Sequence, residues 1–176
     1  GGGLSSAHTT SLSGTAINNP TTSNAGSDIA QCGNGSFTMA ANSPSTGTGA
    51  WSVVSGSATI TSSSSNTSAV TSVSAGASAT LRWTISSGTC TASTDDVVIT
   101  NNSLPTANAG SDVAHCSGAS SSLSASGGVS YSWTPSTGLS ATNVANPNAS
   151  HTSTTTYTVT ATDANGCTDT DDVEVT

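Results

Sequence analysis

Residues 24–32, NAGSDIAQC, decide the fold because they recur as residues 108–116, NAGSDVAHC. Asp28 and Asp112 hold the same place in the two copies, which are therefore 84 residues apart (112 minus 28). Internal repeats of that length are small domains rather than units of a solenoid. The sequence therefore predicts two similar modules in tandem.

The ends of the two modules repeat as well. Residues 90–100 read CTASTDDVVIT and residues 167–176 read CTDTDDVEVT, and Asp95 matches Asp171 at an offset of 76 (171 minus 95). The second module is thus eight residues shorter (84 minus 76), and deletions of this kind belong in loops. We predict an N-terminal extension or linker followed by two domains, at residues 1–19, 20–104 and 105–176.

Serine and threonine dominate the composition, with 37 and 32 residues among 176, as in a disordered Ser/Thr-rich stalk. The hydrophobic pattern argues against disorder. In residues 79–85, ATLRWTI, apolar residues alternate with Thr80, Arg82 and Thr84, which is the period of a strand with one buried face. Threonine also favours strands, and Gly, Asn, Pro and Ser supply turns. We therefore predict an all-β protein with almost no helix, built from two antiparallel β-sandwiches.

Each module has one cysteine on its first strand and one just before its last strand. We predict that Cys32 pairs with Cys90 and Cys116 with Cys167, since only this connectivity of the three possible ones is local to each module. Modules this small bury little apolar surface, and each such bond would stabilise its module by roughly 4 kcal/mol in the chain-entropy model. The alternative is four buried thiols. Disulfides would place the protein outside the reducing cytosol.

The charge argues against several classes of partner. The formal net charge is -8 and Arg82 is the single Lys or Arg, whereas phosphate binding needs clustered cations, so we expect no nucleic-acid partner. Attraction to anionic lipid is not expected on the same ground. No stretch is long or apolar enough to predict a membrane span. No G-x-S-x-G elbow occurs and the three histidines are scattered, so nothing predicts an enzyme or a zinc site.

Acidic residues cluster near the module ends. Calcium takes six to eight oxygen ligands, and Asp163, Asp169 and Asp171 could supply several of them, although no EF-hand spacing is present. The alternative, which we favour, is that these aspartates form turns and keep a cation-poor surface soluble. Calcium is the one candidate cofactor. Asp28 and Asp112 recur in the same motif, which favours a structural role such as accepting backbone N–H bonds in an Asx turn.

Several segments together resemble the tandem Ig-like and PKD-like repeats of very large surface adhesins in gliding bacteria. Besides the repeated NAGSD motif they are GAWSVVSGSATI (49–60), ATLRWTISSGTC (79–90), YSWTPSTGLS (131–140), TYTVTATDANGC (156–167) and TDDVEVT (170–176). The resemblance implies two tandem Ig-like sandwich domains on a secreted chain. It also implies an extracellular place at the bacterial cell surface and a use in attachment, gliding or filament building.

Two sets of residues carry candidate sugar contacts. Trp51 and Trp133 lie on a middle strand of each module, where we expect core residues packed over the disulfide, and the alternative is an exposed aromatic platform for sugars. N-glycosylation sequons occur four times, and in a bacterium they are usually chance matches in a Ser/Thr-rich chain, with O-linked glycans as a further possibility. The sequon asparagines are Asn34, Asn66, Asn101 and Asn148.

The N-terminal extension has no counterpart in the duplication. Its apolar residues Leu4, Leu12 and Ile17 are separated by strand-forming Ser and Thr. The extension is either a flexible linker or an assembly strand that pairs with an open sheet edge of the next subunit. Head-to-tail addition of this kind does not close on itself, so it would build a filament.

These observations favour a structural function. We predict an extracellular module of a bacterial surface adhesin or filament, whose partner is another copy of itself or a neighbouring repeat of a longer chain, with glycans as a further candidate. The alternative is a carbohydrate-binding or adhesive recognition module. No constellation of residues supports catalysis.

Overall fold

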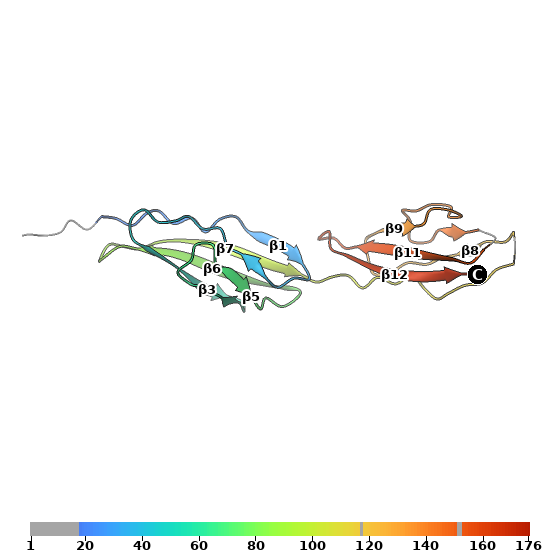
Figure 1. The fold of residues 1–176 in the computed structure, drawn as a ribbon, viewed down its shortest axis with the longest axis horizontal. Helices are drawn as coiled ribbons and strands as arrows, with labels where there is room; N and C mark the ends of the chain where they lie inside the picture. Colours follow the sequence, from blue (N-terminus) through green and yellow to red (C-terminus); the bar gives the residue numbers. More distant parts are fainter. Residues whose placement is uncertain (1–17, 117, 151–152) are drawn as a thin grey trace, which may run out of the picture.

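The computed structural model describes residues 18–116, 118–150 and 153–176, and every regular element in these ranges is a β-strand. The strands form two units that lie end to end along the long axis of the molecule (Figure 1). We call them the N-terminal unit, strands β1 to β7, and the C-terminal unit, strands β8 to β12. The predicted all-β fold is confirmed, and both units are β-sandwiches.

The N-terminal unit packs a four-stranded sheet, in the order β1-β7-β6-β3, against a three-stranded sheet, in the order β2-β5-β4. The long strands β6 and β7 form an antiparallel hairpin that runs the length of the unit. The strand bounds are Ile29–Cys32 (β1), Phe37–Thr38 (β2), Thr48–Ser55 (β3), Thr59–Ile60 (β4), Ala69–Thr71 (β5), Ala77–Ser86 (β6) and Ser93–Asn102 (β7).

The C-terminal unit repeats this plan with fewer strands. A three-stranded sheet, in the order β12-β11-β9, faces the two-stranded pair β10-β8. Its long antiparallel hairpin is formed by β11 and β12. The strand bounds are Ser121–Ser122 (β8), Ser130–Thr134 (β9), Asn148–Ala149 (β10), Thr155–Thr162 (β11) and Thr168–Val175 (β12).

The alternation in the sequence places the core. Leu81, Trp83 and Ile85 of β6 are fully buried, while Arg82 and Thr84 between them stay partly exposed. Strand β11 alternates in the same way, because one face of each strand covers the core and the other meets solvent. Its buried residues are Tyr157, Val159 and Ala161.

The first strand of each unit runs parallel to the last. Ile29 of β1 lies opposite Ile99 of β7, and Val113 forms a parallel bridge with Val175 of β12. These two pairs are equivalent, since 29 and 113 differ by 84 and 99 and 175 differ by 76, the offsets of the sequence repeat. The duplication therefore extends from sequence to strand register.

Each unit has its own core. Trp51 and Trp83 lie at the centre of the first, with ring centroids 5.1 Å apart and ring planes tilted by 46°. Trp133 and Tyr157 are the largest buried side chains of the second. Because the two cores share no residue, the units are held together by what lies between them.

Candidate functional site

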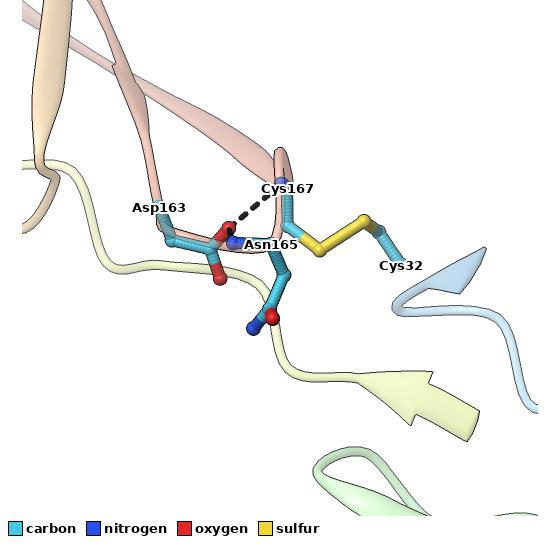
Figure 2. Close-up of a disulfide and its surroundings, with 4 residues drawn as sticks. All are labelled: Cys32, Asp163, Asn165 and Cys167. Atoms are coloured by element: carbon cyan, nitrogen blue, oxygen red, sulfur yellow. Dashed lines mark hydrogen bonds between the residues drawn. A yellow bond between two sulfur atoms is a disulfide. The ribbon is translucent and has the colours of Figure 1, made fainter. Parts of the chain in front are cut away.

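A disulfide joins the two units. Cys32, at the end of β1, is bonded to Cys167, in the turn between β11 and β12, with the two Cα atoms 5.5 Å apart (Figure 2). The bond links residues that are 135 apart in the sequence and closes a loop containing nearly all of both sandwiches. We treat this junction as the candidate functional site.

The predicted pairing within each module is wrong. Because β1 runs parallel to β7, Cys32 lies beside Asn102, at the last residue of β7, whereas Cys90 precedes the first residue of the same strand. Ten residues of extended strand, at about 3.3 Å each, therefore separate the two cysteines. The same geometry separates Cys116 from Cys167 along β12, and neither Cys90 nor Cys116 belongs to the Cys32–Cys167 bond.

The turn that presents Cys167 is held by Asp163. Its Oδ1 accepts the backbone N–H groups of Asn165 and Cys167, both at 2.8 Å, and the backbone N–H of Asp163 donates to the carbonyl of Cys167 (Figure 2). An aspartate that binds backbone groups two and four residues ahead fixes a tight turn. Asp163 therefore positions the sulfur at the tip of the β11–β12 hairpin.

The other side of the junction is formed by the segment after β1 and the connector after β7. Gly33 donates its N–H to the carbonyl of Asn102 and has a φ of 63°. The Leu104 side chain lies so close to it that a Cβ on residue 33 would be 3.0 Å from the Leu104 Cγ. A glycine is thus required twice over, by its backbone angle and by the approach of Leu104.

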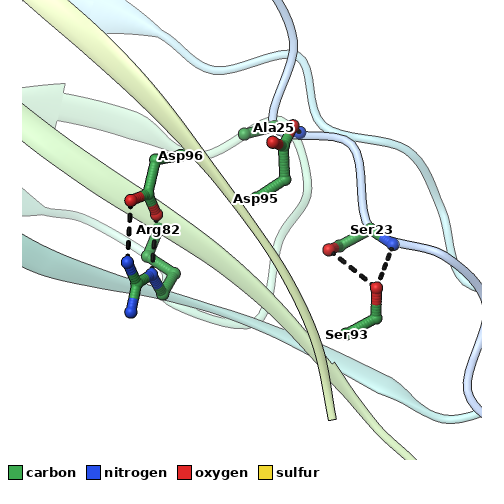
Figure 3. A network of polar contacts seen from close by, with 6 residues as sticks. All are labelled: Ser23, Ala25, Arg82, Ser93, Asp95 and Asp96. Atoms are coloured by element: carbon green, nitrogen blue, oxygen red, sulfur yellow. Dashed lines mark hydrogen bonds and ion pairs between the residues drawn. The ribbon is translucent and has the colours of Figure 1, made fainter.

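The repeated aspartates attach the NAGSD motif to the last long strand of each unit. Asp95 accepts the backbone N–H of Ala25 at 2.7 Å, a contact seen in Figure 3, and Asp171 accepts that of Ala109 at 2.8 Å. Beside the first of these contacts, Ser93 makes a hydrogen bond of 2.9 Å with the backbone N–H of Ser23. The acidic ends of the modules therefore act as backbone clamps.

Asp28 and Asp112 accept backbone N–H bonds as predicted, but from another strand. Asp28 binds the N–H of Val98 and Asp112 that of Glu174, both at 2.8 Å. The local Asx turn belongs instead to the asparagine four residues earlier, which accepts the N–H of the motif glycine in each copy. These bonds fix the register of the first strand against the last.

Replacing Asp171 by alanine is expected to lower the free energy of unfolding of the C-terminal unit by about 1–3 kcal/mol, because the N–H of the buried Ala109 loses a charged acceptor. Urea denaturation followed by Trp fluorescence measures the change. Asp172→Ala, on the exposed face of the same strand, is the control and should change stability by less than about 0.5 kcal/mol. Equal losses from both variants would contradict the clamp.

The three candidate calcium ligands are not gathered into one site. Asp163 binds its own turn, Asp169 accepts the N–H of Ala107 at 2.9 Å, and Asp171 accepts that of Ala109. Among the described residues no group of three or more His, Cys, Asp or Glu side chains is placed to hold a metal ion. The structure gives these carboxylates backbone partners instead.

Trp51 and Trp133 are core residues, each 3% exposed, so neither offers a platform for a sugar. Trp133 donates its indole N–H to the carbonyl of Val144 at 2.9 Å. The expectation that they pack over a disulfide is wrong, because the Cys32–Cys167 bond lies between the units rather than inside either sandwich.

The sequon asparagines differ in exposure. Asn101 is 2% exposed and donates its side-chain N–H to the carbonyl of Val73, and Asn66 donates to the carbonyl of Ala41. Asn34 and Asn148 are exposed. Of the four, the latter pair can present an amide nitrogen to solvent, and the prediction of glycans stays open there.

Arg82 makes a bidentate ion pair with Asp96 on the exposed face of β6 and β7, at 2.6 and 2.7 Å (Figure 3). The hydrogen bonds from Arg82 hold the pKa of Asp96 below its ordinary value, and the carboxylate raises the pKa of Arg82. Ion pairs this exposed contribute little to stability.

Tyr157 predicts an alkaline limit for the C-terminal unit. Burial raises its pKa above the ordinary 10.0, and its hydroxyl donates to the carbonyl of Thr137 at 2.8 Å. A raised pKa in the folded state means full stability below the unfolded pKa and a loss as pH rises through the folded one. Unfolding free energies measured between pH 8 and pH 11 should fall at the alkaline end, and Tyr157→Phe should flatten that fall. An unchanged slope in the variant would contradict this role.

Two further predictions concern the N-terminal assembly strand and a membrane span. Leu4, Leu12 and Ile17, the expected assembly strand, lie outside them, so the strand remains a prediction. Among the described residues no helix is long and apolar enough to cross a membrane.

The fold is that of tandem immunoglobulin domains. The structure is similar to domains 1–4 of Sidekick-1, with a TM-score of 0.50 and 12% identity over 94% of this chain and 51% of that one. It also matches the insect immune protein hemolin (TM-score 0.48, 13% identity, 95% of this chain and 49% of that one) and the two-domain DIP-gamma fragment (0.47, 10%, 90% and 97%). No protein-family model and no curated protein matches the sequence.

Proposed function

We propose that this chain is an extracellular structural module of a bacterial surface adhesin or filament, in which Ig-like sandwiches are joined end to end by disulfides. The observation that carries the proposal is the Cys32–Cys167 bond between the two units. A disulfide of this kind persists in an oxidising environment, which supports a place outside the cytosol.

The bond changes how the molecule bears load. Pulling on the two ends of the chain loads residues before Cys32 and after Cys167, and the disulfide connects these two points directly. The intervening loop, 135 residues in sequence separation, carries no tension along the backbone while the bond is intact. Such a bypass limits unravelling under tension to the strands outside the loop, β1 and β12, and keeps β2 to β11 closed, which suits a stalk or fibre under tension.

The sheet edges support end-to-end contact over side-by-side contact. On the edge strand β3, the N–H of Trp51 donates to the carbonyl of Ser63 in a loop, and on β9 that of Trp133 donates to Thr142. The outer side of β12 is covered by the segment at Val113. Covered edges resist lateral pairing with other sheets. If the N-terminal extension of one copy donates a strand to another copy, that strand would have to pair with backbone groups of the sheet edges that these segments leave uncovered.

Single-molecule pulling from the two termini tests this function. In the oxidised protein the loop stays closed, whereas reduction, or Cys32→Ser, should release roughly 450 Å of additional extended length at about 3.4 Å per residue over 135 residues. Cys116→Ser is the matched control and should extend like the oxidised wild type. Full extension of the oxidised wild-type chain would remove the basis of the proposal.

A further inference from the structure

The four cysteines occupy two equivalent places. Cys32 and Cys116 end the repeated motif and differ by 84, so each lies at the end of the segment that runs parallel to the last strand of its unit. Cys90 and Cys167 each follow a glycine-containing turn between the two long antiparallel strands. Each unit thus carries a motif cysteine at one end and a hairpin cysteine at the other.

The junction shows what these two places do when units meet. The motif cysteine of the N-terminal unit, Cys32, is bonded to the hairpin cysteine of the C-terminal unit, Cys167. The remaining hairpin cysteine, Cys90, lies at the outer end of the N-terminal unit, and the remaining motif cysteine, Cys116, lies at the outer end of the C-terminal unit. The two ends of the chain therefore carry the complementary halves of the same joint.

We propose that Cys116 of one copy of this chain forms a disulfide with Cys90 of the next, so that copies join head to tail through the joint already present between the units. This inference rests on the proposed structural function and supplies its mode of assembly. Since the same end of each copy always meets the opposite end of the next, the contact does not close on itself and yields a linear polymer.

The surroundings of the two thiols match this role. Cys116 is exposed and Cys90 is partly exposed, whereas Cys167, in the completed joint, is 1% exposed. A hollow at the outer end of the N-terminal unit is lined by Cys90, Ala92 and Pro20. Pro20 stands 84 residues before Leu104, the residue that packs on Gly33 in the completed joint. The hollow is thus the equivalent of the surface that receives the N-terminal unit at the junction.

Geometry excludes the same bond within one copy. Strand β7 lies between Cys90 and the junction, and β12 lies between the junction and Cys116, whose neighbour His115 donates its N–H to the carbonyl of Thr176 just after β12. These strands of ten and eight residues, at about 3.3 Å per residue, hold the two sulfurs at opposite ends of the molecule. A Cys90–Cys116 bond must therefore join two copies.

The step needs an oxidant, for which a small disulfide such as oxidised glutathione suffices. The thiolate of Cys116 attacks one glutathione sulfur and expels the other as a thiolate, which leaves a mixed disulfide. The thiolate of Cys90 from the next copy then attacks the Cys116 sulfur and expels the second glutathione. Two thiols lose two protons and two electrons, and one oxidised glutathione becomes two reduced molecules.

Oxidation of the purified chain in a glutathione buffer tests the proposal. Non-reducing electrophoresis should show a ladder of multimers that reducing agent collapses to monomer, and mass spectrometry of the multimers should find the peptide that joins Cys90 to Cys116. Cys90→Ser and Cys116→Ser should each abolish the ladder beyond dimers. An equimolar mixture of the two variants should form one mixed dimer, linked through the cysteine that each retains.

The proposal is tested by which ends of two copies become joined. Isotope labelling of one variant distinguishes mixed dimers from symmetric ones, and head-to-tail assembly predicts that mixed dimers predominate. Symmetric Cys116–Cys116 dimers in equal yield, or a chain that stays monomeric under oxidation, would overturn the proposal. Neither result affects the outcome of the pulling test of the junction, because that test measures the Cys32–Cys167 bond within a single copy.

Discussion

Replacing Cys32 by serine is expected to lower the free energy of unfolding by about 4–5 kcal/mol, the largest effect of any single substitution we predict. The Cys32–Cys167 bond closes a loop over a sequence separation of 135 residues, and in the chain-entropy model the stabilisation by a disulfide grows with the logarithm of loop length. Because most of each unit lies within that closed loop, the bond also couples the unfolding transitions of the two units. Guanidinium denaturation of the monomer followed by Trp fluorescence measures the loss.

Cys116→Ser is the matched control, since it removes an exposed thiol outside this bond. It should change the stability of the monomer by less than about 0.5 kcal/mol. Cys167→Ser should reproduce the effect of Cys32→Ser, because either change removes the same bond. A loss for Cys116→Ser as large as for Cys32→Ser would contradict the pairing seen in the structure.

The strands were predictable from sequence where one face of a strand is buried. The alternation of Leu81, Trp83 and Ile85 with polar residues sets the inward face of β6, and the duplicated motif indicates that the second unit repeats the first. The alternation is visible in neighbouring residues, and the duplication is visible as a constant offset in residue number. They give the fold class and the number of units without any knowledge of how distant strands pair.

The disulfide was not predictable in the same way. A tandem duplication admits two symmetric pairings of its cysteines, one within each unit and one between neighbouring units, and only the shorter sequence separation favours the first. The choice depends on the direction of β1, because parallel pairing with β7 carries Cys32 to the junction and an antiparallel pairing would have carried it away. Strand direction is a property of long-range pairing and leaves no mark on residue spacing.

The aspartates illustrate a second limit. Their recurrence at fixed places indicates a structural role, and the structure assigns Asp28, Asp95 and Asp171 to backbone N–H groups of distant segments. The partners lie 62 or 70 residues away, so a search for local turns could not find them. An aspartate repeated in both copies, with no basic residue to pair with it, is the signal that favours a backbone acceptor.

Gly49→Ala is expected to cost the N-terminal unit about 3 kcal/mol. Gly49 lies opposite Ile85, where a Cβ would overlap the six-membered ring of Trp83 at Cζ2. The Trp83 side chain is fully buried and its ring centroid is 5.1 Å from that of Trp51, so it has no room to withdraw. Overpacking of a rigid core costs about 1–3 kcal/mol and occasionally more. Ala50→Ser, at the exposed neighbouring position, is the control and should be nearly neutral.

A double variant separates this clash from a general weakness of β3. Phenylalanine at position 83 removes the outer ring atoms that a Cβ on residue 49 would meet, and Trp83 Nε1 has no hydrogen-bond partner among the described residues, so no hydrogen bond is lost with it. Gly49→Ala should therefore cost less in the presence of Trp83→Phe than in the wild type, by at least about 1 kcal/mol in a double-mutant cycle. Additive losses would show that the alanine acts through the strand backbone rather than through the ring.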